Sequence, residues 1–183
     1  MMSLSRTVTL SLTALILASC GSAPEKPALS TQDLPPNEAM ALVLRNLNAA
    51  RATARTCGGQ QPGEVAVNAA ATSPVTWNTQ LAVAAQAHAQ DMARRNYFAH
   101  DSPEGGKLER RVEAAGYVNW RDLGENIAGG FTASEVIQGW LDSKEHCITL
   151  MDPVLREVGM AMVTAPSTQN DFANYWVQDF GRR

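Results

Sequence analysis

The sequence is poor in the residues that mark several common functional classes. Its 183 residues include only three histidines and three cysteines, and charged residues make up 18%. Lysine and arginine adjoin one another only in the pairs Arg94-Arg95, Arg110-Arg111 and Arg182-Arg183. The basic stripe that nucleic acid requires is therefore absent, and we expect no nucleic-acid partner. We interpret the three pairs as solvated surface.

Two catalytic signatures are also missing. The sequence contains no HExxH helix, and no Ser-His-Asp arrangement can be read from it. It therefore lacks the local marks of a zinc protease of that type and of a serine hydrolase. The low charged fraction excludes a disordered chain, and the roughly 150 residues that follow the N-terminal segment are enough for one domain with a buried core.

The N-terminal apolar run, residues 8–17, is too short to span a bilayer as a mature helix. Arg6 precedes it, which gives the pattern of an export signal. The run ends in Leu17-Ala18-Ser19-Cys20, which resembles a bacterial lipobox. We predict that residues 1–19 are a lipoprotein signal peptide and that Cys20 is acylated. The alternative is an ordinary signal peptide cut nearby, with Cys20 incidental.

Residues 20–36 are interpreted as the lipidated cysteine and a flexible tether, because they are rich in Pro, Ser and Ala and have no apolar period. Acyl chains stabilise anchoring by about 0.8 kcal/mol per buried methylene, so the membrane is the expected partner. No aspartate follows Cys20, which in the lipoproteins that it resembles points to the outer rather than the inner membrane of a two-membrane cell. We expect an envelope-anchored domain in an oxidising extracytoplasmic space.

The remaining chain, residues 37–183, predicts helices followed by strands. Asn37 and Asn78 are suitable N-caps for two helices, the first ending by Cys57 and the second near residue 96. Further helices are expected over 107–115, after the Thr132–Glu135 capping box, and as one turn within 148–153. Residues 60–74 and most of 117–130 are expected to be loop, the latter with one short strand. Alternating patterns predict strands over 157–164 and 174–180, joined by a loop at 166–171. This order indicates an α+β fold with helices packed on an antiparallel sheet.

Setting Cys20 aside leaves Cys57 and Cys147, an even pair in an exported chain. A disulfide between them is the expected state. Two free thiols are one alternative, and a nucleophilic Cys147 beside His146 is another. His88 lies on the apolar stripe of its helix and is interpreted as a core residue with one hydrogen bond.

A series of short motifs occurs in a specific order along residues 37–183. They are Leu47-Asn48-Ala49-Ala50-Arg51, Trp77-Asn78-Thr79-Gln80-Leu81, His88-Ala89-Gln90-Asp91-Met92, Asn96-Tyr97-Phe98-Ala99-His100, Gly116-Tyr117, Gly124-Glu125-Asn126-Ile127-Ala128, Trp140-Leu141-Asp142-Ser143, His146, Val158-Gly159-Met160-Ala161 and Tyr175-Trp176-Val177-Gln178-Asp179-Phe180. In this order they resemble the compact bacterial form of the CAP superfamily (cysteine-rich secretory proteins, antigen 5 and pathogenesis-related 1 proteins). The resemblance implies a three-layer α-β-α sandwich with a central antiparallel sheet and an open cleft.

The resemblance also implies a cleft that carries two histidines and one or two glutamates. His100 and His146 match the histidines, and Glu125 matches the first glutamate. Ser143 stands where many eukaryotic members have the second, and the role does not transfer to Glu145. Two imidazoles and a carboxylate are a possible first shell for zinc, the one candidate cofactor. Without metal, the same residues suit acid-base chemistry or a structural hydrogen-bond network.

Three functions are compatible with these residues. We favour a non-enzymatic module that binds a small ligand or an envelope partner, because of the expected anchor and the incomplete acidic set. A metal-dependent hydrolase of peptide or envelope polymer, which would use His100, Glu125 and His146, is the alternative. A lipid or sterol carrier, as some relatives are described, comes third, since nothing in the composition indicates an apolar tunnel.

Overall fold

The structure, a computed structural model, describes residues 37–183. The expected signal peptide, the acylation of Cys20 and the tether up to residue 36 lie outside the described residues and stay predictions. Among the described helices, none combines the length and apolarity needed to cross a membrane.

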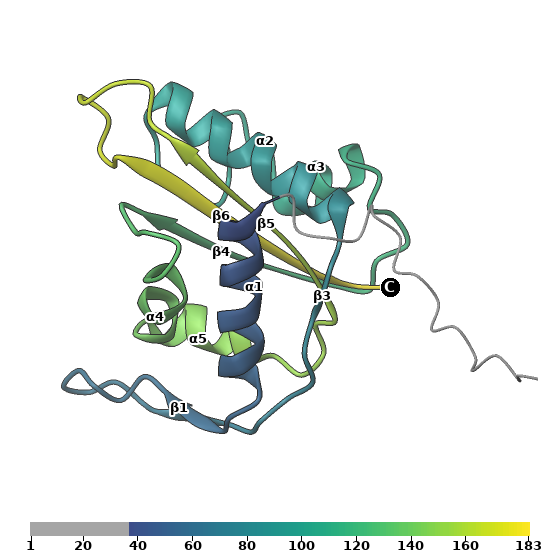
Figure 1. The fold of residues 1–183 in the computed structure, drawn as a ribbon, viewed down its shortest axis with the longest axis vertical. Coiled ribbons are helices and arrows are strands. Elements are labelled where there is room, and N and C mark those ends of the chain that lie inside the picture. Colours follow the sequence, from purple (N-terminus) through teal and green to yellow (C-terminus); the bar gives the residue numbers. More distant parts are fainter. Residues whose placement is uncertain (1–36) are drawn as a thin grey trace, which may run out of the picture.

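A four-stranded sheet in the order β3-β5-β6-β4 forms the middle of the molecule (Figure 1). Its strands are β3 (Thr76–Trp77), β4 (Asp122–Gly129), β5 (Glu157–Thr164) and β6 (Asn174–Arg182). β6 pairs antiparallel with both β4 and β5. The short β3 pairs parallel with the first residues of β5. The sheet is therefore antiparallel, as expected, apart from this two-residue addition at one edge.

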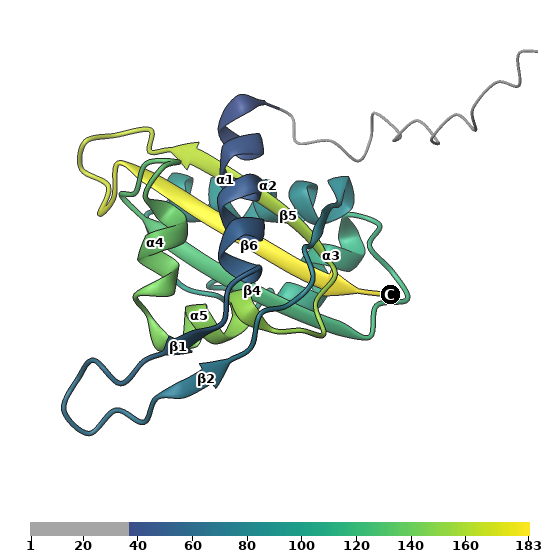
Figure 2. The same ribbon diagram turned by 60° about the horizontal axis from the view of Figure 1, so that its bottom comes forward.

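Three helices cover one face of the sheet: α1 (Glu38–Arg51), α4 (Val136–Leu141) and α5 (Lys144–Met151). Figure 2 shows α1 crossing in front of the strands. The buried core of this layer includes Val43 and Leu47 of α1, Trp140 of α4, and Trp176 and Phe180 of β6. The large rings fill the space between helices and sheet, so these tryptophans serve packing.

The other face carries α2 (Thr79–Arg95) and α3 (Leu108–Ala114). Small residues of α2 let it approach the sheet closely, and a Cβ at Gly159 of β5 would overlap the α2 backbone at Ala82. Helices on both faces make the three-layer α-β-α sandwich that the resemblance implied.

Local signals set the helix starts where the sequence predicts them. The Asn37 side chain accepts a hydrogen bond from the Met40 N–H, and Asn78 accepts from Gln80 and Leu81. Gly116, with φ +87°, follows α3 as expected of a C′ residue. The Glu135 carboxylate accepts from the Thr132 N–H, which is half of the predicted capping box.

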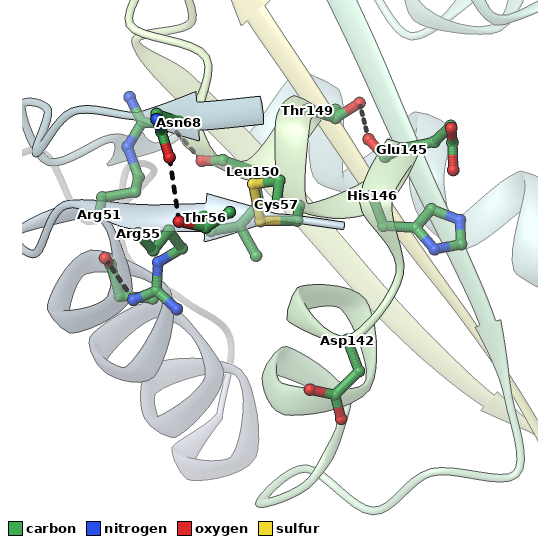
Figure 3. The surroundings of a disulfide bond; sticks show 12 residues. Arg51, Arg55, Thr56, Cys57, Asn68, Asp142, Glu145, His146, Thr149 and Leu150 are labelled. Atoms are coloured by element: carbon green, nitrogen blue, oxygen red, sulfur yellow. Dashed lines mark hydrogen bonds between the residues drawn. A yellow bond between two sulfur atoms is a disulfide. The ribbon is translucent and has the colours of Figure 1, made fainter. Parts of the chain in front are cut away.

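The segment after α1 differs from the prediction. α1 ends at Arg51, and Arg55–Cys57 forms β1, which pairs with β2 (Val67–Ala69) in a separate hairpin. The sequence predicts helix and loop for these two segments, because three-residue strands are too short to show an alternating pattern. The expected Cys57–Cys147 disulfide is present and ties β1 to α5 (Figure 3). It excludes both free thiols and a nucleophilic Cys147.

Two other elements are longer than predicted. β4 spans eight residues where one short strand within a loop was expected, and α5 begins at Lys144 rather than near residue 148. Glycines and polar residues in β4 hide the alternation of apolar and polar residues that would mark a strand. The strand forms because all eight residues pair with β6.

Candidate functional site

Glu125 occupies the middle of β4, directly opposite Asp179 of β6. Side chains two residues apart in a strand share a face, so Glu125 lies on the same face as Ile127, which packs in the α2 core. The glutamate side chain is only 4% exposed. A carboxylate this deeply buried needs partners for its charge.

Two side chains from α3 and the loop before it supply those partners. His100 Nδ1 lies 2.7 Å from Glu125 Oε1, and Arg111 Nη2 lies 2.5 Å from Oε2. An ionised carboxylate only accepts hydrogen bonds, so His100 Nδ1 carries a proton and Nε2 is the ring nitrogen left for other partners. The His100 side chain is 54% exposed. The site therefore presents one imidazole edge to solvent above a buried ion pair.

Arg111 also fixes the loop that carries His100. Its Nη1 donates to the carbonyl oxygens of His100, at 3.0 Å, and Gly106, at 2.9 Å. Only 12% of its side chain is exposed. The interpretation of the Arg110-Arg111 pair as solvated surface is therefore wrong for Arg111: Arg110 points to solvent, whereas Arg111 on the next position of α3 points to the sheet.

The pKa values follow from these contacts. Burial alone raises the pKa of Glu125, but the hydrogen bond from His100 and the charge of Arg111 outweigh it and hold this pKa below its ordinary value. The hydrogen bond to Glu125 raises the pKa of His100, against the opposing effect of burial. The pair thus favours a charged imidazole beside a charged carboxylate.

His146 lies on α5, on the other side of β4. Its backbone carbonyl accepts from the Asn126 amide at 3.3 Å, and Figure 3 shows its ring on the side of α5 away from the disulfide. Burial first, and then the positive charge of His100, lower the pKa of His146. The charge of His100 therefore reaches His146, but no hydrogen bond joins the His146 ring to His100 or Glu125.

These three residues do not fit a three-ligand zinc site as they lie. Both Glu125 oxygens are engaged, by His100 and by Arg111. Across residues 37–183, no three His, Cys, Asp or Glu side chains gather closely enough to hold a metal ion. Zinc binding at His100, Glu125 and His146 stays a hypothesis that would require Glu125 or His146 to move.

Asp179 is, after Arg111, the second site residue that sequence reasoning missed. It is fully buried, and no N–H or O–H group donates to either carboxyl oxygen. Only a protonated Asp179 carboxyl, as the donor, can bond to Glu125. Burial raises its pKa well above the ordinary value, and the charge of Glu125 raises it further. The sequence does hold one signal for Asp179: it is an acidic residue within a run that forms a strand buried on both faces, where acidic residues are rare.

Asp179→Asn is expected to stabilise the protein near pH 7, by roughly 1–2 kcal/mol. A raised pKa means that the folded state keeps a proton that the unfolded chain releases above its ordinary value of 3.8. The free energy of unfolding therefore falls as pH rises from about 4 toward the folded pKa, and asparagine removes that loss. Urea unfolding between pH 4 and 8 measures both effects. Asp142→Asn, at an exposed site, should change neither the stability nor its pH dependence, and a destabilised Asp179→Asn would contradict the assignment.

His88 is the core residue that the sequence indicated. It is 1% exposed, and its Nε2 lies 3.0 Å from the carbonyl oxygen of Ala99. Burial lowers its pKa. It therefore holds the backbone next to His100 and does not face the solvent side of the site.

Comparison with known sequences gives one family. The sequence model of the cysteine-rich secretory protein family, CAP, matches residues 44–180. Among curated proteins, the uncharacterized membrane protein YlbC of Bacillus subtilis (strain 168) is 34% identical over 101 residues, which cover 55% of this chain and 29% of YlbC. The chain thus spans less than a third of that relative.

Two solved structures share the fold. An extracellular protein of Bacillus anthracis str. Ames that contains an SCP domain is 31% identical, with a TM-score of 0.52 over 61% of this chain and 35% of that one. An outer surface protein of Borrelia burgdorferi has a TM-score of 0.62 over 82% of this chain and 96% of its own, at 17% identity.

Proposed function

The chain belongs to the cysteine-rich secretory protein (CAP) family, and from that premise we propose that it is a non-enzymatic binding module whose ligand contacts His100. The chain's disulfide and the extracellular or surface location named for its relatives support an extracytoplasmic place of action. Anchoring through Cys20 would hold the module at the envelope membrane.

The observation that carries this proposal is the occupied carboxylate of Glu125. A general base needs enough basicity to take up a proton, but the hydrogen bonds from His100 and Arg111 to the two Glu125 oxygens hold the pKa of this carboxyl below its ordinary value. Both described cysteines are joined in the disulfide, so neither can act as a nucleophile. What the site offers a ligand is the exposed edge of His100, held in one orientation.

The alternative, a metal-dependent hydrolase, has one observation in its favour. His100 lies close enough to His146 for its positive charge to lower the pKa of His146, and both histidines would present neutral imidazole to a metal at alkaline pH. For a hydrolase, Glu125 would first have to lose its bond to Arg111, because only then could its carboxylate serve as the third metal ligand. The lipid or sterol carrier has no such specific support.

Thermal unfolding of the full chain, with a panel of short peptides and muropeptides and with zinc chloride as probes, tests the proposal. At least one organic probe should raise the melting temperature of the wild type but not of His100→Ala. Arg110→Ala, an exposed neighbour of the site, is the matched control and should respond like the wild type.

Whether the probes are cleaved distinguishes a binding module from a hydrolase. A binding module leaves every probe intact in mass spectra, with zinc or without it. Zinc-dependent cleavage that is lost in both His100→Ala and His146→Ala would establish the hydrolase. A panel in which no probe distinguishes wild type from His100→Ala would overturn the proposed site.

A further inference from the structure

We propose that the free edge of β5, toward the edge of the sheet opposite β4 and its Glu125, binds an extended peptide as an added strand. In the sheet order β3-β5-β6-β4, only the two-residue strand β3 lies outside β5. β3 covers this edge only at Glu157 and Val158. From Met160 to Thr164, no described strand lies on the outer side of β5.

The phase of the hydrogen bonds shows which groups point outward. Within β5, the Val158 carbonyl accepts from the Asn78 N–H, on the outer side. The Ala165 N–H donates to Ala173, on the β6 side. Because the direction alternates along an antiparallel strand, Met160, Met162 and Thr164 direct both their N–H and C=O groups to the open edge. No backbone partner for these six groups occurs among residues 37–183.

A groove runs along this edge. One part, of about 420 Å³, lies between α2 and β5 and is lined by Trp77, Ala82, Val83, Gln86, Gln90 and Met160. A second part, of about 290 Å³, shares Gln90 and is lined further by Ala93, Arg94, Val163, Thr164 and Pro166. Val83, on the α2 wall of the groove, is 53% exposed. The groove thus combines apolar walls with a row of unpaired backbone groups.

Residues 160–164 of β5 carry none of the features that normally prevent strand addition. Proteins protect exposed edges with charged side chains, prolines or bulges. Between Met160 and Thr164 the sequence is Met-Ala-Met-Val-Thr, with no charge and no proline, and its pairing with β6 is regular throughout. An unprotected edge is consistent with one that is used for binding.

The occupant is argued from continuity with the pairing that β3 already makes. β3 lies on this edge of β5 for two residues, and the chain then turns away into α2. A peptide of about five residues, roughly 17 Å long, would continue the same line along β5. Only another extended backbone offers donors and acceptors at the spacing that Met160, Met162 and Thr164 require. Alternate side chains of that peptide would lie in the groove beside Val83 and Gln86.

Selection from a phage-displayed library of random twelve-residue peptides, with the full chain as target, tests the proposal. Selected peptides, made synthetically, should slow amide hydrogen exchange at Met160, Met162 and Thr164. In the free protein these amides should exchange faster than those of Ala161 and Val163, which bond to β6. N-methylation of the peptide amides that face β5 should abolish binding, and methylation of the alternate amides should not.

Met162→Pro removes one outward N–H without breaking a bond to β6, because proline is tolerated at such edge positions. It should weaken peptide binding about tenfold, the effect of losing one hydrogen bond. Met162→Ala keeps the N–H and should bind within about threefold of wild type. Failure to select any peptide, or equal binding by Met162→Pro, would overturn the proposal. So would a dimer of the free chain that Met162→Pro converts to a monomer, because a second copy would then occupy the edge.

Discussion

Replacing Cys57 and Cys147 together by alanine is expected to lower the free energy of unfolding by about 4–5 kcal/mol. The two cysteines are 90 residues apart, and both are fully buried. In the chain-entropy model, a cross-link that closes a loop of about this length restricts the unfolded chain by that amount. The bond joins β1 to α5, so its loss should loosen the helix that carries His146 first.

Equilibrium unfolding of the full chain in urea measures this difference. The reductant control is internal: adding dithiothreitol should lower the stability of the wild type to that of the double variant, and should leave the double variant unchanged. Equal stabilities of the oxidised wild type and the double variant would contradict the role assigned to the disulfide.

Arg51→Met is expected to cost about 3–5 kcal/mol, the range for breaking a buried charged network. The arginine is fully buried without a carboxylate partner. Its guanidinium donates instead to the backbone carbonyls of Ser73, Leu150, Asp152 and Leu155. Burial, with repulsion from Arg156, lowers its pKa to about 10, which leaves it charged at neutral pH. Methionine fills a similar volume but leaves these carbonyls without their donor.

Urea unfolding again provides the measurement, with Arg45→Ala as the control because Arg45 is an exposed arginine on the same helix. That control should change stability by less than about 0.5 kcal/mol. Arg51→Lys should be intermediate, because it keeps the charge but loses the planar fork of donors. A loss below about 1 kcal/mol in Arg51→Met would show that water replaces the guanidinium.

The parts of the fold that were predictable from the sequence are those set by nearby residues. Asn37 and Asn78 cap helices because their side chains bond to N–H groups two or three positions away. β1, β2 and β3 have too few residues to display a period, and their partners are distant in sequence. Whether such short segments become strands depends on pairing with residues far away in the sequence, and that pairing cannot be inferred from a single sequence.

The candidate site divides in the same way. Motif resemblance identified His100 and Glu125, which the structure brings into contact. The role of Arg111 could not be predicted because Arg110 beside it is the same residue type. Only the orientation of α3 about its own axis determines which of the two arginines faces the sheet and which faces solvent. Asp179 becomes part of the site only through the register of β4 and β6, which neither strand specifies alone.

The most direct test of the account is a pH titration of the histidine side chains by nitrogen-15 NMR, in wild type and in Glu125→Gln, with Arg110→Ala as control. We predict that His100 titrates above the ordinary histidine pKa of 6.5 and His146 below it. We also predict that Glu125→Gln lowers the pKa of His100 and that Arg110→Ala does not. A His100 that titrates below His146, or that ignores the loss of the Glu125 charge, would contradict the site on which the proposed function depends.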